Sequence, residues 1–381
     1  MPSLHGLRNV IFLVKTVFFP NGSRPLDRIF TSANKLPAPR PKNYPYLRFD
    51  LYGNSRMKDK DTLLALVEGE IARLPLDKTE PSGLYAPIRY ILEDGGKRIR
   101  PLLCLMGADI YGNHPERALA AAVAVEVFHN FTLLHDDIMD KAELRRGRPT
   151  VHLKWGESGA ILSGDAMLIL AYQILQGGTA TYGTELLPEL LAVFNRAAME
   201  VCQGQQYDME FEVCQTPVTR EAYIEMIRLK TSVLLAAALE MGAVVGGASR
   251  EERAALYEFG VNLGLAFQIQ DDLLDTYGDE QTFGKTIGGD IAVGKKTFLH
   301  ITAMERATAA QQQAILAPGE TDEKVTRVRG IYDALGVRTA AEEAITACFE
   351  QALTALRRAH TDCQRLTVLE TYAYSLMKRN K

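Results

Sequence analysis

Two stretches of the sequence decide the fold class: FHNFTLLHDDIMD at residues 128–140 and FQIQDDLLD at residues 267–275. Each ends a long segment whose apolar residues recur at helical spacing, and each finishes with the pattern D-D-x-x-D. Residues four apart lie on one face of a helix, so Asp136 and Asp140 point the same way, as do Asp271 and Asp275. The two stretches therefore predict two largely apolar helices that end in clusters of carboxylates.

Helical spacing continues through most of the chain from Lys58 onward, and alternating strand patterns are absent. Short glycine-rich loops separate the segments, and the segment 117–140 is apolar nearly all round, which places it centrally. We predict an all-α fold, a single large bundle of about ten helices with a core large enough to hold a pocket. The expected helices cover about 59–74, 82–94, 117–140, 157–176, 185–213, 219–247, 250–276, 296–316, 322–335, 338–358 and 363–379.

Residues 1–57 differ from the rest of the chain. The stretch 9–20 is apolar but interrupted by Lys15, and no small-residue cleavage site of a signal peptide follows it. We interpret 1–57 as a disordered leader, or as an extension upstream of a working start at Met57. The predicted linker is 37–46, and 58–381 forms one predicted domain.

The composition excludes several classes of protein. With 43 Lys and Arg against 47 Asp and Glu, the formal net charge of −4 argues against binding nucleic acid or an anionic membrane by bulk charge. The five cysteines are scattered without a C-x-x-C pair, which fits a reducing compartment and predicts a cytoplasmic protein. No uninterrupted apolar run reaches the roughly 18 residues of a membrane span, so we expect no stable membrane insertion.

Three carboxylates within five residues repel one another unless a cation neutralises them. One D-D-x-x-D alone would be read as a solvated helix end, but two copies on apolar helices indicate a function. Oxygen ligands without His or Cys favour Mg²⁺ over zinc, and Mg²⁺ is usually held by one or two carboxylates together with substrate phosphate oxygens. The two turns therefore predict a Mg²⁺-dependent diphosphate site.

Basic side chains suited to phosphate accompany the acidic turns. GGKRIRP at 95–101 supplies three in what we expect to be a loop that begins with glycine and ends at Pro101, and LRRGRP at 144–149 supplies three more. Lys230 lies in a helical stretch, and further lysines follow the second acidic turn. Arginine binds phosphate as a fork and lysine as a point charge. Each cluster alone would be a solvated loop, but beside two acidic turns they indicate an anion site.

With these pieces the chain resembles the trans-type isoprenyl diphosphate synthases, also called polyprenyl synthetases. The resemblance covers residues 58–381 and implies an all-α fold around a deep central cavity, usually as a homodimer. It also implies Mg²⁺-dependent, head-to-tail condensation of an allylic diphosphate with isopentenyl diphosphate. The matching segments are GGKRIRP (95–101), FHNFTLLHDDIMDKAELRRGRPTVH (128–152), ILSGDAML (161–168), GQQYDMEF (204–211), KTS (230–232), FQIQDDLLD (267–275) and GKTIGGDIAVGKKT (284–297).

The resemblance also implies roles for individual residues at the matching positions. Three Mg²⁺ ions would be held by Asp136, Asp140 and Asp271, with Asp137, Asp272 and Asp275 as supporting carboxylates. Isopentenyl diphosphate would contact Lys97, Arg100, His129 and Arg146. The allylic diphosphate would contact Arg145, Lys230, Thr231, Gln268, Lys285 and Lys295. The residues expected to drive ionisation of the allylic C–O bond are Asp136, Asp140, Asp271, Lys230 and Arg145.

Product length is predicted from the helix that carries Asp136. Thr132 and Phe131, four and five positions earlier, are expected about one turn deeper on the same face. Of these, only Phe131 is large enough to be a floor for the growing chain. In the family, a single aromatic at this place accompanies a C20 product and a pair accompanies C15. We therefore expect geranylgeranyl diphosphate, with farnesyl diphosphate or a longer product as alternatives.

Two other classes of protein share parts of this pattern. A class I terpene cyclase also ionises a diphosphate with Mg²⁺, but it needs no isopentenyl diphosphate site, so GGKRIRP, LRRG and the second D-D-x-x-D speak against it. A non-catalytic synthase subunit is expected to have lost one acidic turn, and both are intact here. Activity of the purified chain alone would separate this last possibility from an active synthase.

Overall fold

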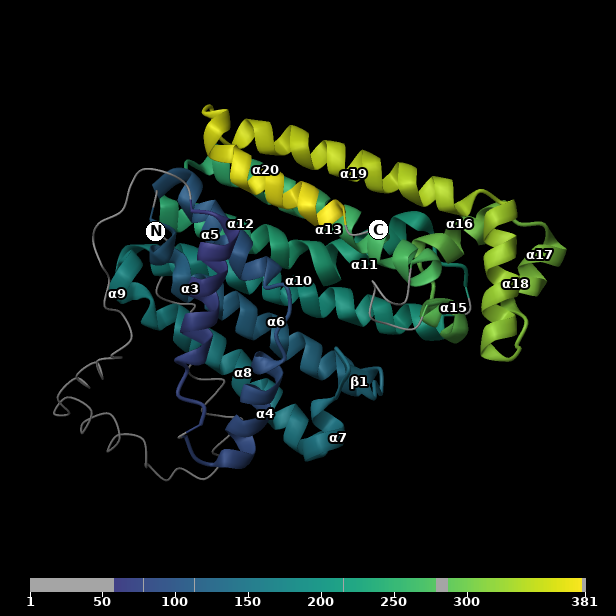
Figure 1. Cartoon of the computed structure of the whole chain (residues 1–381), viewed down its shortest axis with the longest axis horizontal. Coiled ribbons are helices and arrows are strands. Elements are labelled where there is room, and N and C mark those ends of the chain that lie inside the picture. The colour runs from purple at the N-terminus through teal and green to yellow at the C-terminus, as the bar shows by residue number, and fades with distance from the viewer. Residues whose placement is uncertain (1–57, 78, 113, 215, 279–286, 379–381) are drawn as a thin grey trace, which may run out of the picture. The chain divides into compact units, whose positions relative to one another are not determined.

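The computed structural model describes residues 58–77, 79–112, 114–214, 216–278 and 287–378. The predicted leader, the predicted linker and Lys285 lie outside these residues. Within the described ranges the protein is helical, apart from one short antiparallel pair, β1 (Leu144–Arg145) and β2 (Arg148–Pro149) (Figure 1). The predicted all-α class is confirmed, and eleven of the described helices have twelve or more residues.

The helices of the described residues follow one another through short connections. Three are not ordinary α-helices: η2 and η3 are 3₁₀ turns, and η4 is a π-helical turn. In chain order they are α3 (Lys60–Ala72), α4 (Ser82–Glu93), α5 (Ile99–Gly112), η2 (Pro115–Ala118), α6 (Leu119–Met139), α7 (Val151–Trp155), α8 (Glu157–Gly177), α9 (Thr179–Tyr182), η3 (Thr184–Leu186), α10 (Leu187–Val213), α11 (Arg220–Ile227), η4 (Arg228–Ser232), α12 (Val233–Gly246), α13 (Arg250–Tyr277), α15 (Gly289–Val293), α16 (Phe298–Arg306), α17 (Ala309–Leu316), α18 (Thr321–Ala334), α19 (Val337–Ala359) and α20 (Cys363–Met377).

Helix α12 lies at the centre, because α5, α6, α10 and α13 all contact it and nearly all of its residues are buried. Glycine allows α5 and α12 to approach closely. A Cβ on Gly107 would lie 2.6 Å from the Leu239 carbonyl oxygen, and one on Gly242 would lie 2.8 Å from the Cys104 carbonyl carbon. α6 is buried over its first three turns, as its apolar sequence predicts, and packs along α8.

A second apolar cluster joins α11 and the carboxyl half of α13 to α16, α17, α18 and α19. In Figure 1, α19 runs along α13, while α17 and α18 lie at the far end of the bundle. The cluster surrounds Asp272 with packed side chains, including Tyr223 and Phe298. The second acidic turn therefore rests on its own apolar support, separate from that of the first.

Three expected element boundaries were wrong. GGKRIRP does not form a loop as far as Pro101, because α5 begins at Ile99; proline is tolerated in the first turn, where its missing N–H has no helical partner. The expected helix 296–316 is divided into α16 and α17, since Thr308 caps the second helix and forms a capping box with Gln311. The expected helix 219–247 is interrupted by the π-turn η4.

We expected no stretch long and apolar enough to span a membrane. That expectation was wrong, because three helical stretches are long enough and have a high enough mean hydropathy. The stretches Pro115–Met139, Glu157–Tyr182 and Arg220–Gly246 meet both criteria. In the first and third, 72% and 78% of the most apolar window is buried inside the bundle, whereas in the second only 33% is. Interior packing therefore accounts for the first and third, while the apolar surface of Glu157–Tyr182 remains exposed.

Candidate active site

The first acidic turn lies at the end of α6, and its three carboxylates have different surroundings. Asp137 is 2% exposed and accepts a fork of hydrogen bonds from Nε and Nη2 of Arg145 at 2.7–2.9 Å. Burial raises the pKa of Asp137, and Arg145 opposes that change. Burial, and then the charge of Asp136, raise the pKa of Asp140 to about 6. Asp137 therefore holds Arg145, while Asp136 and Asp140 are two close carboxylates that a cation would stabilise.

The β1–β2 hairpin carries the basic pair of the LRRG segment. Its two central residues, Arg146 and Gly147, have φ of 52° and 79°, the left-handed values that a tight hairpin turn requires. The hairpin directs Arg145 to Asp137, and it directs Arg146 to the Gly95 carbonyl, which accepts from Nη1 at 2.7 Å. The LRRG segment thus connects the first acidic turn to the glycine-rich segment before α5.

The second acidic turn lies within the last turns of α13. Asp272 is 6% exposed and accepts hydrogen bonds from the Tyr223 hydroxyl, from Gln268 Nε2 at 3.2 Å and from the Phe298 N–H at 3.2 Å. Burial, and then the charge of Asp290, raise the pKa of Asp272 to about 7. These three donors are neutral, so they satisfy the carboxylate without pairing its charge. Tyr223 is a site residue that our reading of the sequence missed.

The π-turn η4 connects the two acidic turns. Lys230 Nζ donates to Asp208 Oδ2 at 2.5 Å and to Asp136 Oδ1 at 3.3 Å. The neighbouring Thr231 Oγ1 donates to Gln268 Oε1 at 3.0 Å, and Gln268 in turn donates to the second acidic turn. π-turns are rare and occur frequently at functional sites. Asp208 was also missed as a site residue, although it lies in the matching segment GQQYDMEF.

Lys295 and α15 close the site beside the second acidic turn. The Asp290 N–H donates to Asp275 Oδ2 at 3.0 Å, which ties the start of α15 to α13. Burial lowers the pKa of Lys295, but the carboxylates of Asp208 and Asp290 outweigh it and raise that pKa. Asp272 and Asp140 also raise it, so carboxylates of both turns act on one lysine. Lys285, expected in the same region, lies outside the described residues.

Arg98 anchors the GGKRIRP segment from inside. It is 3% exposed with a φ of 44°, and its guanidinium donates to Glu68 Oε1 at 2.8 Å, Glu126 Oε1 at 2.9 Å and the Leu92 carbonyl at 2.6 Å. The exposed Lys97 precedes it. The sequence signal for Arg98 was its place inside a matching motif, but nothing in the sequence showed that it is buried.

Arg100 and His129, both expected to bind isopentenyl diphosphate, contact each other in the same region. Arg100 Nη1 lies 3.0 Å from His129 Nε2, and because a guanidinium can only donate, Nε2 must be the acceptor. Burial, and then the charge of Arg100, hold the pKa of His129 well below its usual value. Burial lowers the pKa of Arg100 to about 10, and its buried Nε has no hydrogen-bond partner among the described residues. A cation with an unused buried donor fits an anionic ligand.

The expectation that Phe131 and Thr132 share the face of Asp136 was wrong for Phe131. A five-residue step turns a helix by about 140°, whereas a four-residue step returns to within about 40°. The Phe131 ring lies 4.8 Å from the His135 ring, measured between centroids, and His135 Nε2 lies 3.1 Å from the Ile161 carbonyl oxygen of α8. Phe131 therefore points toward the seam between α6 and α8. Its role as the floor remains a prediction.

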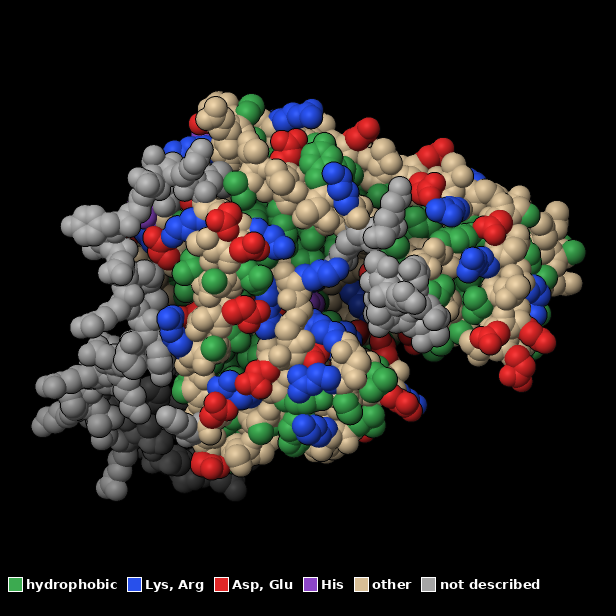
Figure 2. Space-filling view, viewed as in Figure 1, with side chains coloured by type: hydrophobic (Ala, Val, Ile, Leu, Met, Phe, Trp, Pro, Cys, Tyr) green, Lys and Arg blue, Asp and Glu red, His purple; other side chains and the backbone are tan. Residues whose placement is uncertain are grey.

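The donor set fits Mg²⁺ that is shared with a substrate. No group of three or more His, Cys, Asp or Glu side chains among the described residues could hold a metal ion. Mg²⁺ usually takes only one or two carboxylates together with substrate phosphate oxygens, and Asp136 and Asp140 are two carboxylates close enough for one to raise the pKa of the other. Figure 2 shows Lys and Arg side chains gathered around a hollow near the middle of one face, as a diphosphate site requires.

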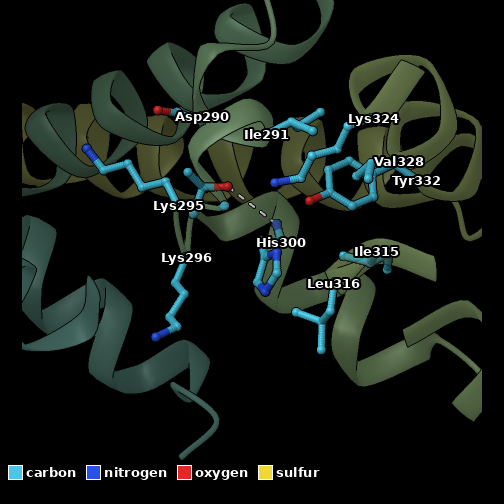
Figure 3. Close-up of a pocket in the computed structure, with 12 residues that line it drawn as sticks. Asp290, Ile291, Lys295, Lys296, His300, Ile315, Leu316, Lys324, Val328 and Tyr332 are labelled. Carbon is cyan, nitrogen blue, oxygen red and sulfur yellow. Dashed lines mark hydrogen bonds between the residues drawn. The ribbon is translucent and has the colours of Figure 1, made fainter. Parts of the chain in front are cut away.

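A small cavity of about 100 Å³ lies behind α15, between α16, α17 and α18. Figure 3 shows Lys324 and Tyr332 pointing to one space, while Lys296 points away, toward the carbonyls of Phe211 and Cys214 that it binds. Asp136, Asp140 and Asp271 do not line this cavity, and its size suits a few water molecules. Because Lys295 and Asp290 also line it, the cavity borders the diphosphate site but does not contain the three aspartates.

Comparison with known proteins gives a consistent result. A 42% identical short chain isoprenyl diphosphate synthase of Methanothermobacter thermautotrophicus matches over 67% of this chain and 78% of its own. A 45% identical geranylgeranyl diphosphate synthase of Methanosarcina mazei matches over 61% of this chain and 70% of its own. The crystal structure of a geranylgeranyl pyrophosphate synthase superposes with a TM-score of 0.80 at 43% identity, covering 85% of this chain and 100% of that one.

The family assignment rests on the chain's own match to a family model. Residues 81–335, which contain both acidic turns and the basic segments around them, match the model for polyprenyl synthetase. Another similar structure, at 29% identity and a TM-score of 0.73, is a geranylgeranyl pyrophosphate synthase from Corynebacterium glutamicum complexed with isoprenyl diphosphate and magnesium; it covers 84% of this chain and 97% of that one. The chain belongs to the polyprenyl synthetase family.

Proposed function

We propose that the protein is a prenyltransferase that condenses isopentenyl diphosphate head-to-tail with allylic diphosphates, in the presence of Mg²⁺, to give geranylgeranyl diphosphate. The observation that carries this proposal is the chain of contacts from Asp136 through Lys230, Thr231 and Gln268 to Asp272. It places one cation and two polar side chains between the two carboxylate turns, an arrangement suited to stabilising a departing diphosphate. Relatives named geranylgeranyl diphosphate synthases support the C20 product.

In this mechanism, bound Mg²⁺ supplies charge neutralisation of the departing diphosphate. Arg145, fixed by Asp137, and Lys230, fixed by Asp208, orient that diphosphate and stabilise the negative charge that develops on it. The allylic C–O bond then ionises, and the cation requires an apolar surrounding that excludes water.

The second substrate is held about two helical turns before Asp136, because His129 lies seven residues earlier on nearly the same face of α6. Arg100, with its unused Nε, and Arg146 bind the diphosphate of isopentenyl diphosphate, and the neutral His129 fixes the Arg100 guanidinium. The substrate double bond attacks the allylic cation, and a proton leaves the new cation to the released diphosphate. This reaction needs no separate protein base.

Product analysis tests the proposal. Purified protein is incubated with Mg²⁺, isopentenyl diphosphate and, separately, the C5, C10 and C15 allylic diphosphates, with an Asp271→Ala preparation as the control for contaminating synthases. We expect C20 from all three primers. A stop at C15, or elongation to C25 or beyond, overturns the C20 assignment. Absence of any condensation by the folded protein overturns the prenyltransferase proposal and favours a cyclase or a regulatory subunit.

Phe131 provides the sharper test of product length. It lies where α6 meets α8, with its ring 5.5 Å from that of Phe128, measured between centroids. We expect Phe131→Ala to extend the product beyond C20, because the change removes the side chain that is the expected floor. Phe128→Ala is the matched control, since Phe128 is fully buried in the core and is expected to lower stability without changing product length. An unchanged product distribution for Phe131→Ala overturns the floor role.

We also propose that the protein is a homodimer whose interface includes α8. This helix exposes Leu162 and Ile169 at 60% and 59%, and Met199 of α10 is 61% exposed. Burial of such side chains against a second copy would be favourable. Light scattering should give a dimer, and Leu162→Glu should give monomers; a monomeric wild-type protein overturns the proposal.

Two further proposals concern setting and metal content. All five cysteines lie in described residues and are unpaired, which supports a reducing, cytoplasmic location. Recovery of the protein in a membrane fraction would contradict this location.

Three Mg²⁺ ions per active site follow from the resemblance, and a titration in the presence of an unreactive diphosphate analogue should count them.

A further inference from the structure

The π-turn η4 is packed between two helices that each present a glycine to it. We propose that Gly204 of α10 and Gly264 of α13 are positioning residues that set the places of Lys230 and Thr231. The proposal deepens the proposed function and rests on it, because it concerns how the same diphosphate site is held. Neither glycine touches a substrate in this scheme; each acts through η4.

On the α10 side, the backbone of η4 lies directly against Gly204. A Cβ added there would lie 2.6 Å from Lys230 Cα and 2.7 Å from the Leu229 carbonyl carbon, and real Cβ atoms essentially never come within 3.0 Å of such neighbours. One turn further along the same face of α10, Asp208 accepts the hydrogen bond from Lys230 Nζ. Gly204 and Asp208 thus hold the backbone and the ammonium of one residue.

On the α13 side the arrangement is repeated with the neighbouring residues of η4. A Cβ on Gly264 would lie 2.6 Å from Ser232 Cα and 2.7 Å from its Oγ. Four residues later, Gln268 accepts the hydrogen bond from Thr231 Oγ1 at 3.0 Å. Each flanking helix therefore uses a glycine for close approach and the residue four positions later to bind a side chain of the turn.

This double contact matters because a π-turn carries one residue more than a regular turn and is seldom stable alone. If η4 relaxed to a regular α-helix, the residues after it would be turned about the helix axis by about 100° relative to those before it. Lys230 would then lose its place between Asp136 and Asp208. The two glycines leave room for η4 only in its present position. The geometry of η4 therefore depends on how α10 and α13 pack against it.

Two glycines of α13 supply a matched test. Gly260, one turn before Gly264, is equally crowded, with a Cβ expected 2.5 Å from Ala236 Cα, but it faces the regular helix α12. We expect Gly260→Ala and Gly264→Ala to lower the unfolding midpoint by similar amounts. Only Gly264→Ala should lower kcat/KM for the allylic diphosphate, by about a hundredfold, because small misplacements of binding groups are costly. The KM for isopentenyl diphosphate should not change.

The α10 side is tested in the same way. Gly204→Ala is compared with Gly242→Ala, whose added Cβ would lie 2.8 Å from the Cys104 carbonyl carbon, in a contact between α12 and α5 away from η4. Asp208→Asn adds no atom and therefore tests this side even where Gly204→Ala does not fold. It should lower the allylic kcat/KM about tenfold, and combined with Gly204→Ala it should cost less than the product of the two effects.

Equal kinetic losses in Gly260→Ala and Gly264→Ala, or an unchanged allylic kcat/KM in Asp208→Asn, would overturn the positioning role. An inactive wild-type protein would instead overturn the proposed function. In that case, calorimetry with Mg²⁺ and inorganic diphosphate still tests the glycines. Weaker binding in Gly264→Ala than in Gly260→Ala supports the positioning role, and equal affinity contradicts it.

Discussion

The two acidic turns share one sequence pattern but not one environment. In the first, the middle carboxylate Asp137 is paired with an arginine fork, and the helix ends at the turn. In the second, the middle carboxylate Asp272 receives only neutral donors from Tyr223, Gln268 and the Phe298 backbone, and the helix continues past it. The same D-D-x-x-D pattern therefore contains a buried carboxylate paired with an arginine in one helix and a buried carboxylate with only neutral donors in the other.

This difference indicates a division of roles. The first turn positions a cation, Arg145, that can act on a ligand, whereas the second turn is a site of negative charge supported by a separate apolar cluster. Carboxylates of both turns, Asp140 and Asp272, raise the pKa of Lys295. The following tests compare the turns, starting with the largest expected effect.

The outer carboxylates should be equally indispensable. We expect Asp136→Ala and Asp271→Ala each to lower kcat by about a thousandfold at saturating Mg²⁺, because each removes charge that neutralises the diphosphate through the metal. Steady-state assays with isopentenyl and C15 allylic diphosphates measure the loss. Glu350→Ala, which removes an exposed carboxylate from α19, is the control. If either aspartate variant keeps a tenth of the activity, the two turns do not act together.

The middle carboxylates should differ in stability. Asp137→Asn removes the nearer of the two carboxylates paired with Arg145, the other being Asp136 at 3.9 Å. It should lower the free energy of unfolding by about 2–3 kcal/mol, a value below the fully buried limit because Arg145 is partly exposed. Asp272→Asn keeps an acceptor for neutral donors and removes a buried charge that these donors do not pair, so it should cost less than Asp137→Asn, at most about 1 kcal/mol. Urea unfolding at pH 7 without Mg²⁺ measures both. Equal losses would show that the two environments are energetically the same.

The smallest expected effect concerns how the free energy of unfolding changes at low pH through a histidine of α16, the helix whose Phe298 N–H binds the second turn. His300 lies in the first turn of α16, and burial, followed by the charges of Lys296 and Lys324, lowers its pKa to about 4. Because the pKa of His300 is lower in the folded protein, the unfolded chain binds the proton at a higher pH. His300 therefore does not weaken the fold above pH 6.5, and it lowers the free energy of unfolding as the pH falls toward 4.

We therefore expect His300→Asn to reduce the loss of unfolding free energy between pH 6.5 and 4 by about 2 kcal/mol relative to the wild-type protein. Urea unfolding of both proteins across that range gives the difference. His360→Asn is the control, because it changes a histidine outside the support of the second turn. Parallel pH profiles for wild type and His300→Asn would show that His300 does not carry this dependence.

Much of the site could be predicted from local patterns. Helical spacing placed the D-D-x-x-D segments on helices, and the chemistry of Asp, Arg and Lys predicted a diphosphate site with Mg²⁺. Arg100 and His129, both expected to bind isopentenyl diphosphate, lie side by side in the structure. Arg98, Asp208 and Tyr223 were missed because their roles depend on partners 22 to 49 residues away in sequence, which no spacing rule relates.

The sequence by itself determined the helical class, the two acidic turns and the kinds of side chain that accompany them, because helical periodicity and side-chain chemistry are local properties. Only the tertiary structure decided that Asp137 binds Arg145 while Asp272 binds neutral donors, that Phe131 faces α8, and that η4 is a π-turn. The physical reason is packing. Glycines such as Gly204 and Gly264 let distant backbones meet, and these contacts set where each cation and each carboxylate lies.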